Sequence, residues 1–220
     1  MMADNNILQI SAAVLLIATF AVVSRRGFMD WLNAYRYQSI VLAAITALIA
    51  SITGIWEIYL AAGLTLLIKA VIIPKILLRI TGKLTLEVRT EISPYISIRA
   101  SVLISAMLVA LSYFLTQQIS IKTDSIVSTF LPVSVSLFLI GLFVMVVRKK
   151  ALSQVVGLLI LENGLFLFAT ALTHGLSLVI EIGIFVDILV GIIISAILMS
   201  RINYTFDSLS VENLESLRDD

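Results

Sequence analysis

The sequence predicts an all-α integral membrane protein with about seven transmembrane helices. Its 220 residues are 60% hydrophobic and only 13% charged, and the mean hydropathy is +1.10, far outside the usage of soluble domains. The apolar runs approach the roughly 20 residues that a helix needs to cross a hydrocarbon core about 30 Å thick. They lack the alternating pattern of barrel strands, so the spans are predicted to be helical.

Hydropathy predicts seven spans, of which the second is short and the third long. In chain order they cover residues 7–23, 39–52, 58–78, 98–115, 126–147, 155–172 and 178–199. The first is expected to be a retained helix rather than a secretory signal, because basic residues follow it and none precedes it. Pro74 is expected either to end the third helix or to kink it, since proline cannot donate a backbone hydrogen bond.

The basic residues predict how the chain crosses the membrane. All but Lys69 and Lys122 of the 15 lysines and arginines fall in the segments after spans one, three, five and seven. By the positive-inside rule these segments are cytoplasmic, so the N-terminus is predicted outside and the C-terminus in the cytoplasm. This partition independently supports an odd number of spans.

The composition excludes several functions. There is no cysteine, so the chain can form neither a disulfide nor a thiolate-held iron–sulfur cluster, and a single histidine cannot supply a bis-histidine haem site. No nucleophile with a base, metal-ligand cluster or phosphate loop is present, so no catalytic or metal site is predicted on this chain. A retinal protein is excluded because the last span has no lysine for a Schiff base. No nucleic-acid partner is expected.

Five ionisable residues fall in or beside the apolar runs. A charge in the hydrocarbon costs roughly 2.5 to 3.5 kcal/mol per residue even on insertion scales, so each is a candidate functional residue. They are Glu57, Lys69, Glu162, Glu181 and Asp187.

Glu162 and Asp187 are predicted to lie at the same depth. They flank the turn near Gly175 at similar separations, which places both about 18 to 20 Å from it, near the middle of the bilayer. Asp187 shares a stripe of one helix with small residues at intervals of four, so it is expected to face protein rather than lipid. Burial disfavours the ionised carboxylate, which would let both groups load and release protons. A structural hydrogen-bonding role for either remains the alternative.

The remaining candidates are weaker. Glu57 and Glu181 are expected at helix starts near the surface, and His174 in a turn, so all three are secondary sites. Lys69 lies deep if its helix continues through Pro74. It either snorkels to the interface, or is a membrane-embedded base or the counter-ion of an acid on another helix.

The last three spans resemble the small K-type subunit of respiratory complex I and the related C-type subunit of multisubunit Na⁺/H⁺ antiporters. The matching stretches are VGLLILENGLFLFATAL and DILVGIIISAILMSRINYTFDSLS. In that family each of the last two helices carries one membrane carboxylate, and the resemblance places these at Glu162 and Asp187. The second is aspartate here where complex I has glutamate.

The whole chain, including TLLIKAVIIPKILLRI with Lys69, is similar to the E component of hydrogenase-4, a membrane subunit of formate hydrogenlyase and related membrane-bound [NiFe] hydrogenases. This similarity implies a prokaryotic inner-membrane subunit beside antiporter-like and other membrane-arm subunits. It also implies that the nickel–iron centre and the iron–sulfur clusters sit on partner chains, with no cofactor on this one.

These observations give a leading hypothesis and two alternatives. Residues 1–125 are expected to form a four-helix membrane region, 126–203 a three-helix K-like unit and 204–220 a cytoplasmic tail. The leading hypothesis is a non-catalytic subunit of a proton-translocating hydrogenase complex, relaying protons through Glu162, Asp187 and Lys69. The alternatives are a subunit of a Na⁺/H⁺ antiporter assembly, and a scaffold whose acids only fix helix packing.

Overall fold

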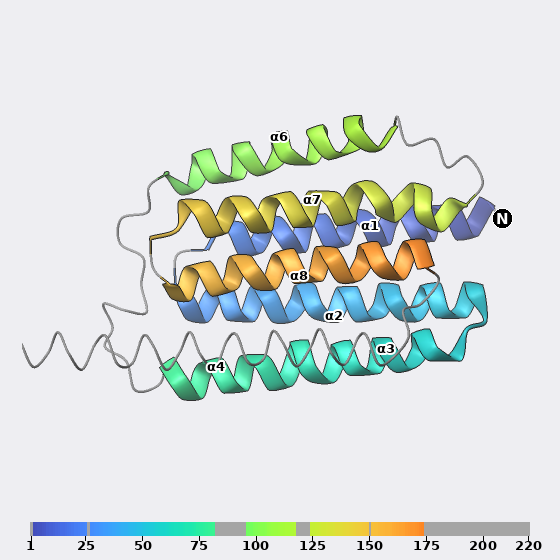
Figure 1. Ribbon diagram of the computed structural model, residues 1–220, viewed down its shortest axis with the longest axis horizontal. Coiled ribbons are helices and arrows are strands. Elements are labelled where there is room, and N and C mark those ends of the chain that lie inside the picture. Colours follow the sequence, from blue (N-terminus) through green and yellow to red (C-terminus); the bar gives the residue numbers. More distant parts are fainter. Residues whose placement is uncertain (1, 26, 82–95, 118–123, 150, 174–220) are drawn as a thin grey trace, which may run out of the picture.

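The computed structural model describes residues 2–25, 27–81, 96–117, 124–149 and 151–173, and apart from a single bridge residue, Gly27, its elements are all helices (Figure 1). The elements are α1 (Met2–Val23), α2 (Phe28–Thr53), α3 (Trp56–Leu67), the π-helical turn η1 (Ile68–Ile72), α4 (Ile73–Thr81), α6 (Ile98–Gln117), α7 (Ser125–Val147) and α8 (Ala151–Thr173).

Six helices in the described part of the chain are long and apolar enough to cross a membrane, with α3, η1 and α4 forming one continuous span. This agrees with a multi-pass membrane protein and with the first six predicted spans. The seventh predicted span, residues 178–199, lies outside the described residues, as does the tail. The division into three regions and the direction of crossing stay predictions.

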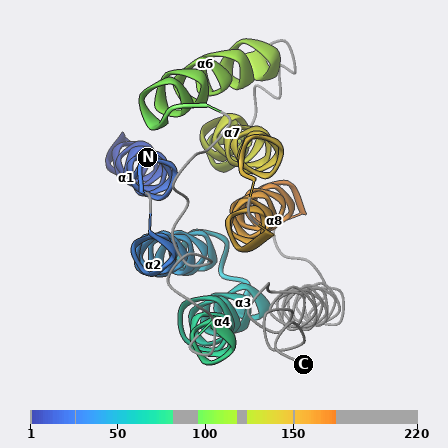
Figure 2. The ribbon, with the colours of Figure 1, turned by 90° about the vertical axis from the view of Figure 1, so that its left-hand side faces the viewer.

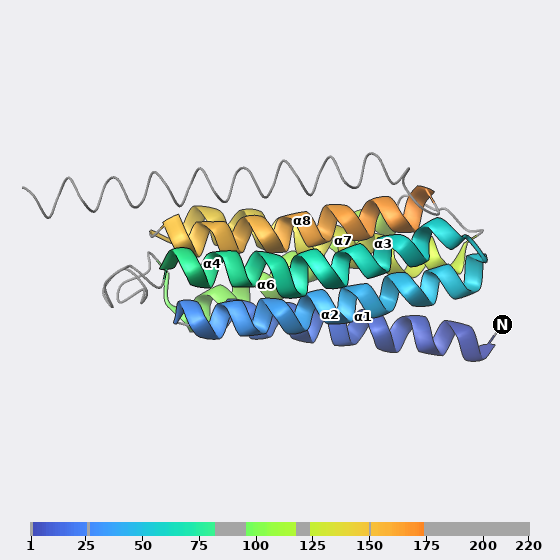
Figure 3. The same ribbon diagram turned by 90° about the horizontal axis from the view of Figure 1, so that it is seen from below.

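The helices run nearly parallel to one long axis (Figure 3). Seen along that axis, α1 and α2 form one row and α7 and α8 face them in a second (Figure 2). Helix α6 packs beside α7 at one side, and the α3–α4 span packs beside α2 at the other. The core fills the space between the rows, where α2 contacts α8 and α1 contacts α7.

Helix α2 begins at Phe28, well before the predicted start at residue 39. The prediction was wrong because residues 28–38 include polar side chains that lower the local hydropathy. Trp31, Tyr35 and Gln38 nevertheless fall on one helical face and are buried against the bundle. Tertiary packing therefore extends the helix by about three turns.

The third span continues through Pro74 by widening one turn. Proline lacks the N–H that would bond to the carbonyl four residues earlier, and its ring clashes with that carbonyl. In η1 the backbone N–H of Ile73 instead donates to the carbonyl oxygen of Ile68, five residues back. Thr65, Lys69 and Ile73 all remain buried on the inner side of this span. Single π-turns of this kind are frequent at functional sites.

Helices α7 and α8 are in backbone contact through glycines. A Cβ atom on Gly141 of α7 would lie 2.5 Å from the backbone nitrogen of Leu161, and one on Gly164 of α8 would lie 2.7 Å from the backbone nitrogen of Phe138. Small residues at such crossings let helices approach closely and gain van der Waals contact, the main attraction between helices in lipid. This contact fixes which face of α8 turns towards α2 and α3.

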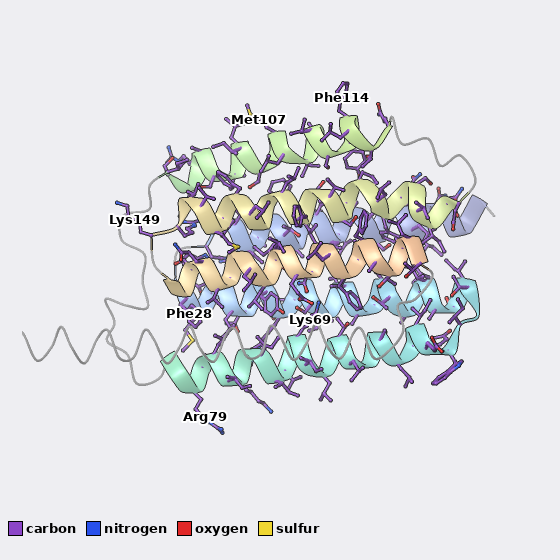
Figure 4. All side chains as sticks on the ribbon, in the orientation of Figure 1. Phe28, Lys69, Arg79, Met107, Phe114 and Lys149 are labelled. Carbon is purple, nitrogen blue, oxygen red and sulfur yellow. The ribbon has the colours of Figure 1, made fainter. Side chains whose placement is uncertain are left out.

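Basic side chains collect at one end of the bundle, where α1, α4 and α7 end and α2, α6 and α8 begin. Arg79 and Lys149 mark this basic end in Figure 4. Among the described basic residues Lys69 lies farthest from it and Arg36 lies two turns into α2, whereas the opposite end carries Glu57 and the α7 N-cap Asp124. The charge partition that predicts the topology therefore corresponds to two ends of the folded bundle.

Candidate functional site

An ion pair lies at the centre of the bundle. The Nζ of Lys69 is 2.6 Å from Oε1 of Glu162, and both side chains are buried. Glu162 is midway along α8, about 16 Å from either end, and Lys69 is close to the midpoint of the α3–α4 span. Figure 4 shows Lys69 inside the bundle, well away from the end marked by Arg79 and Lys149.

The backbone positions both groups. Gly157 and Gly164 of α8 lie against α7. Glu162 and Asn163, which are buried, therefore lie on the side of α8 that faces α2 and the third span. On the other side of the pair, the π-turn carries Lys69 inward one turn before Pro74. The lysine therefore does not snorkel to the interface.

A hydrogen-bonded chain of side chains extends from the pair across the bundle. Lys69 Nζ donates to Oδ1 of Asn163 at 3.0 Å, and Nδ2 of Asn163 donates to Oε1 of Gln38 at 3.4 Å. Nε2 of Gln38 donates to Oγ1 of Thr19 at 2.8 Å, and this hydroxyl donates to the carbonyl oxygen of Leu15. The chain thus joins the third span, α8, α2 and α1, and every side chain in it is buried.

The ammonium of Lys69 has other contacts besides its ion pair with Glu162. Besides the carboxylate and the amide oxygen of Asn163, the ammonium lies 4.5 Å from the centre of the Phe166 ring. A cation over an aromatic ring gains roughly 0.5 to 2 kcal/mol, more where water is excluded. Protonation of Glu162 would therefore weaken the ion pair and leave the contacts of the ammonium with Asn163 and Phe166 in place.

Such a pair can couple two proton-transfer events. A buried ion pair repays the desolvation of its charges only while both partners are ionised. A proton arriving at Glu162 removes the negative charge that holds the proton on Lys69, so the lysine becomes easier to deprotonate. Two titratable groups whose charges depend on each other in this way are the usual elements of acid–base function.

The predicted site residues divide into described and undescribed ones. The structure brings together Glu162 and Lys69, the latter in its predicted alternative as the counter-ion of an acid on another helix. Glu57 lies in the first turn of α3, away from the pair, as expected for a helix start. Asp187, Glu181 and His174 lie outside the described residues, so the predicted pairing of Glu162 with Asp187 stays a prediction.

The sequence analysis missed the uncharged members of the site. Asn163, Gln38 and Thr19 complete the hydrogen-bonded chain, and none of them is among the predicted candidates. A signal was present, because side-chain amides inside or beside an apolar span must find partners within the protein. Within the described residues, no group of three or more histidine, cysteine, aspartate or glutamate side chains could hold a metal ion.

Comparison with known proteins shows a relative that is similar to the chain over almost its whole length. The uncharacterized protein Rv0085 of Mycobacterium tuberculosis is 30% identical to it over 210 residues, which are 95% of this chain and 94% of that protein. The chain belongs to the same family as this mycobacterial protein.

The chain is also similar to a named hydrogenase subunit. Hydrogenase-4 component E of Escherichia coli K12 is 24% identical to the chain over 207 residues, 94% of this chain and 95% of that protein. The component E proteins of Escherichia coli O157:H7 and Shigella flexneri give the same values. This full-length similarity agrees with the resemblance seen in the sequence. No protein-family model and no solved structure matches the chain.

Proposed function

We propose that the chain is a non-catalytic membrane subunit of a proton-translocating, membrane-bound hydrogenase of the formate hydrogenlyase type, in which Glu162 and Lys69 pass protons within the membrane arm. The observation that carries the proposal is the ion pair of 2.6 Å at the centre of a bundle of membrane-spanning helices. Full-length similarity to hydrogenase-4 component E supports the assignment to a hydrogenase complex.

The position of the pair suits proton transfer better than packing alone. A charged pair buried in a low-dielectric interior is often no more stable than apolar residues of the same size, so stability alone gives little reason to keep it. The hydrogen-bonded chain through Asn163 and Gln38 holds the lysine in place, whichever form Glu162 takes. Asp187 on the last predicted span remains the proposed second carboxylate.

The proposal implies a division of labour among subunits. Antiporter-like and other membrane-arm subunits would be the neighbours of this chain in the inner membrane of a prokaryote. The nickel–iron centre and the iron–sulfur clusters would sit on partner chains that carry the redox reaction. This chain would supply acid–base groups only, with its N-terminus outside and its basic end in the cytoplasm.

Replacing Glu162 by glutamine is the direct test. Glu162→Gln keeps the side-chain volume but cannot take up a proton, so hydrogen production by the complex in inside-out vesicles should continue while the coupled uptake of protons is lost. Proton uptake would be followed with a pH-sensitive dye during turnover. Glu57→Gln is the matched control, because Glu57 lies at the start of α3 and away from the pair. It should pump as the native chain does.

The outcomes separate the three functions. Normal pumping by Glu162→Gln contradicts the relay. Failure of the complex to assemble supports the scaffold. If a sodium gradient drives proton movement that depends on Glu162 in vesicles without hydrogenase turnover, the chain belongs to an antiporter assembly instead.

A further inference from the structure

We propose that Tyr35 on α2 is the group through which protons reach Glu162 from the basic end of the bundle, by way of water held between Tyr35, Ser39 and Glu162. The inference rests on the proposed function and adds to it a direction of entry and a residue that carries the proton. It is carried by the placement of the phenol and by a group of buried polar atoms without partners.

Tyr35 lies between the basic end and the ion pair. It is two turns into α2, about 10 Å from the start of that helix at the basic end, whereas Glu162 is about 16 Å into α8. The ring is fully buried and packs in a core cluster with Leu159 of α8 and Ile73 of α4. Gln38, three residues further along α2, accepts a hydrogen bond from Asn163, the neighbour of Glu162, so this part of α2 lies beside the carboxylate.

Polar atoms without partners gather around this position. The hydroxyls of Tyr35 and Ser39 make no aligned hydrogen bond, although Ser39 is one turn further along the same face of α2 and the two hydroxyls lie close enough to interact with each other. Both carboxylate oxygens of Glu162 also lack an aligned hydrogen bond, although Oε1 makes the ion pair with Lys69. All of these side chains are more than nine-tenths buried.

Internal water satisfies such groups in native proteins. Buried polar atoms are nearly always hydrogen-bonded, and where protein partners are missing an ordered water with two to four polar neighbours takes their place. Two hydroxyls and a carboxylate supply both donors and acceptors for water. A metal cation fits less well, because the ammonium of Lys69 already occupies the positive side of the carboxylate.

A tyrosine hydroxyl can conduct a proton without becoming charged overall. A hydronium on the side of the basic end gives a proton to Tyr35 Oη, and the phenol releases its own proton to a water beside Glu162. That water passes a proton to a carboxylate oxygen of Glu162, and rotation of the hydroxyl restores the starting state. Each step makes one O–H bond and breaks one, and no oxidant or reductant is needed.

Tyr35→Phe in the assembled complex tests this role. The substitution removes the oxygen and keeps the ring in its apolar cluster, so the protein should assemble normally and keep its thermal stability. Proton uptake per hydrogen produced, measured in inside-out vesicles, should fall by about tenfold or more. Tyr113→Phe is the matched control, because Tyr113 lies on α6 with 39% of its surface exposed. It should leave proton uptake unchanged.

A second measurement excludes a purely structural effect. After a pH jump on the cytoplasmic side, the carboxyl band of Glu162 in infrared difference spectra should appear more slowly in Tyr35→Phe, with its final amplitude unchanged. Native rates in both assays would overturn the inference, as would failure of the variant to assemble. If Glu162→Gln pumps normally, the proposed function itself fails; if only Tyr35→Phe does, the relay stands and the entry route is wrong.

Discussion

Lys69→Met is expected to destabilise the folded chain by about 3 to 5 kcal/mol, because it removes one partner of a buried ion pair and leaves the other charge uncompensated. Methionine matches the length of the lysine stem, so the loss should come from the ammonium rather than from packing. The midpoint of thermal unfolding of the full-length protein in detergent measures the effect.

The double variant Lys69→Met/Glu162→Gln separates the effect of charge on stability from the effect of side-chain shape. Removing both charges leaves no unpaired ion in the interior, so the double variant should recover most of the stability that the single one loses. The coupling energy follows from the four proteins of the cycle. Equal losses in the single and the double variant would contradict the pairing of Lys69 with Glu162.

Gly141→Ala is expected to cost about 1 to 3 kcal/mol or more, because the added methyl group has no space between α7 and α8. It would lie 2.5 Å from the backbone nitrogen and 2.7 Å from the Cα of Leu161, atoms that cannot move without separating the helices. Separation would also turn or shift Glu162, which follows Leu161 directly. The midpoint of thermal unfolding and the proton uptake should therefore both fall.

Gly63→Ala is the matched control for this packing effect. It makes the same chemical change within a membrane span, yet a Cβ atom at Gly63 meets nothing within 4 Å. Alanine favours the helix over glycine by roughly 1 kcal/mol, so this variant should be as stable as the native chain or slightly more so. If both alanine variants behave alike, the close α7–α8 contact is not what holds α8 in place.

The sequence predicts the class of fold well and the lengths of its elements less well. Apolar runs of membrane-spanning length are a strong local signal, since any such helix must satisfy its backbone hydrogen bonds within itself. Hydropathy fails where a helix is partly polar and becomes buried only by its neighbours, as in the first three turns of α2. It also leaves open the effect of Pro74, because a widened turn and a helix end look the same in sequence.

The candidate site was predictable in part. Glu162 stands out because an ionisable side chain in an apolar span is costly wherever the helix packs, so it is a candidate site residue from the sequence alone. Asn163 and Gln38 do not stand out in this way, since an amide at the edge of an apolar run or beside a charge can be accommodated in several positions at little cost in free energy.

The sequence by itself therefore determined that the chain is a multi-span helical membrane protein with an acid at mid-bilayer depth, and left the depth of Lys69 open. Only the tertiary structure decided that Lys69 and Glu162, which are 93 positions apart, meet at 2.6 Å and share their polar neighbours. The reason is physical: depth along a helix is fixed by counting residues, but the direction a side chain faces depends on helix packing. Here the glycine contacts of α8 with α7 and the π-turn before Pro74 set those directions.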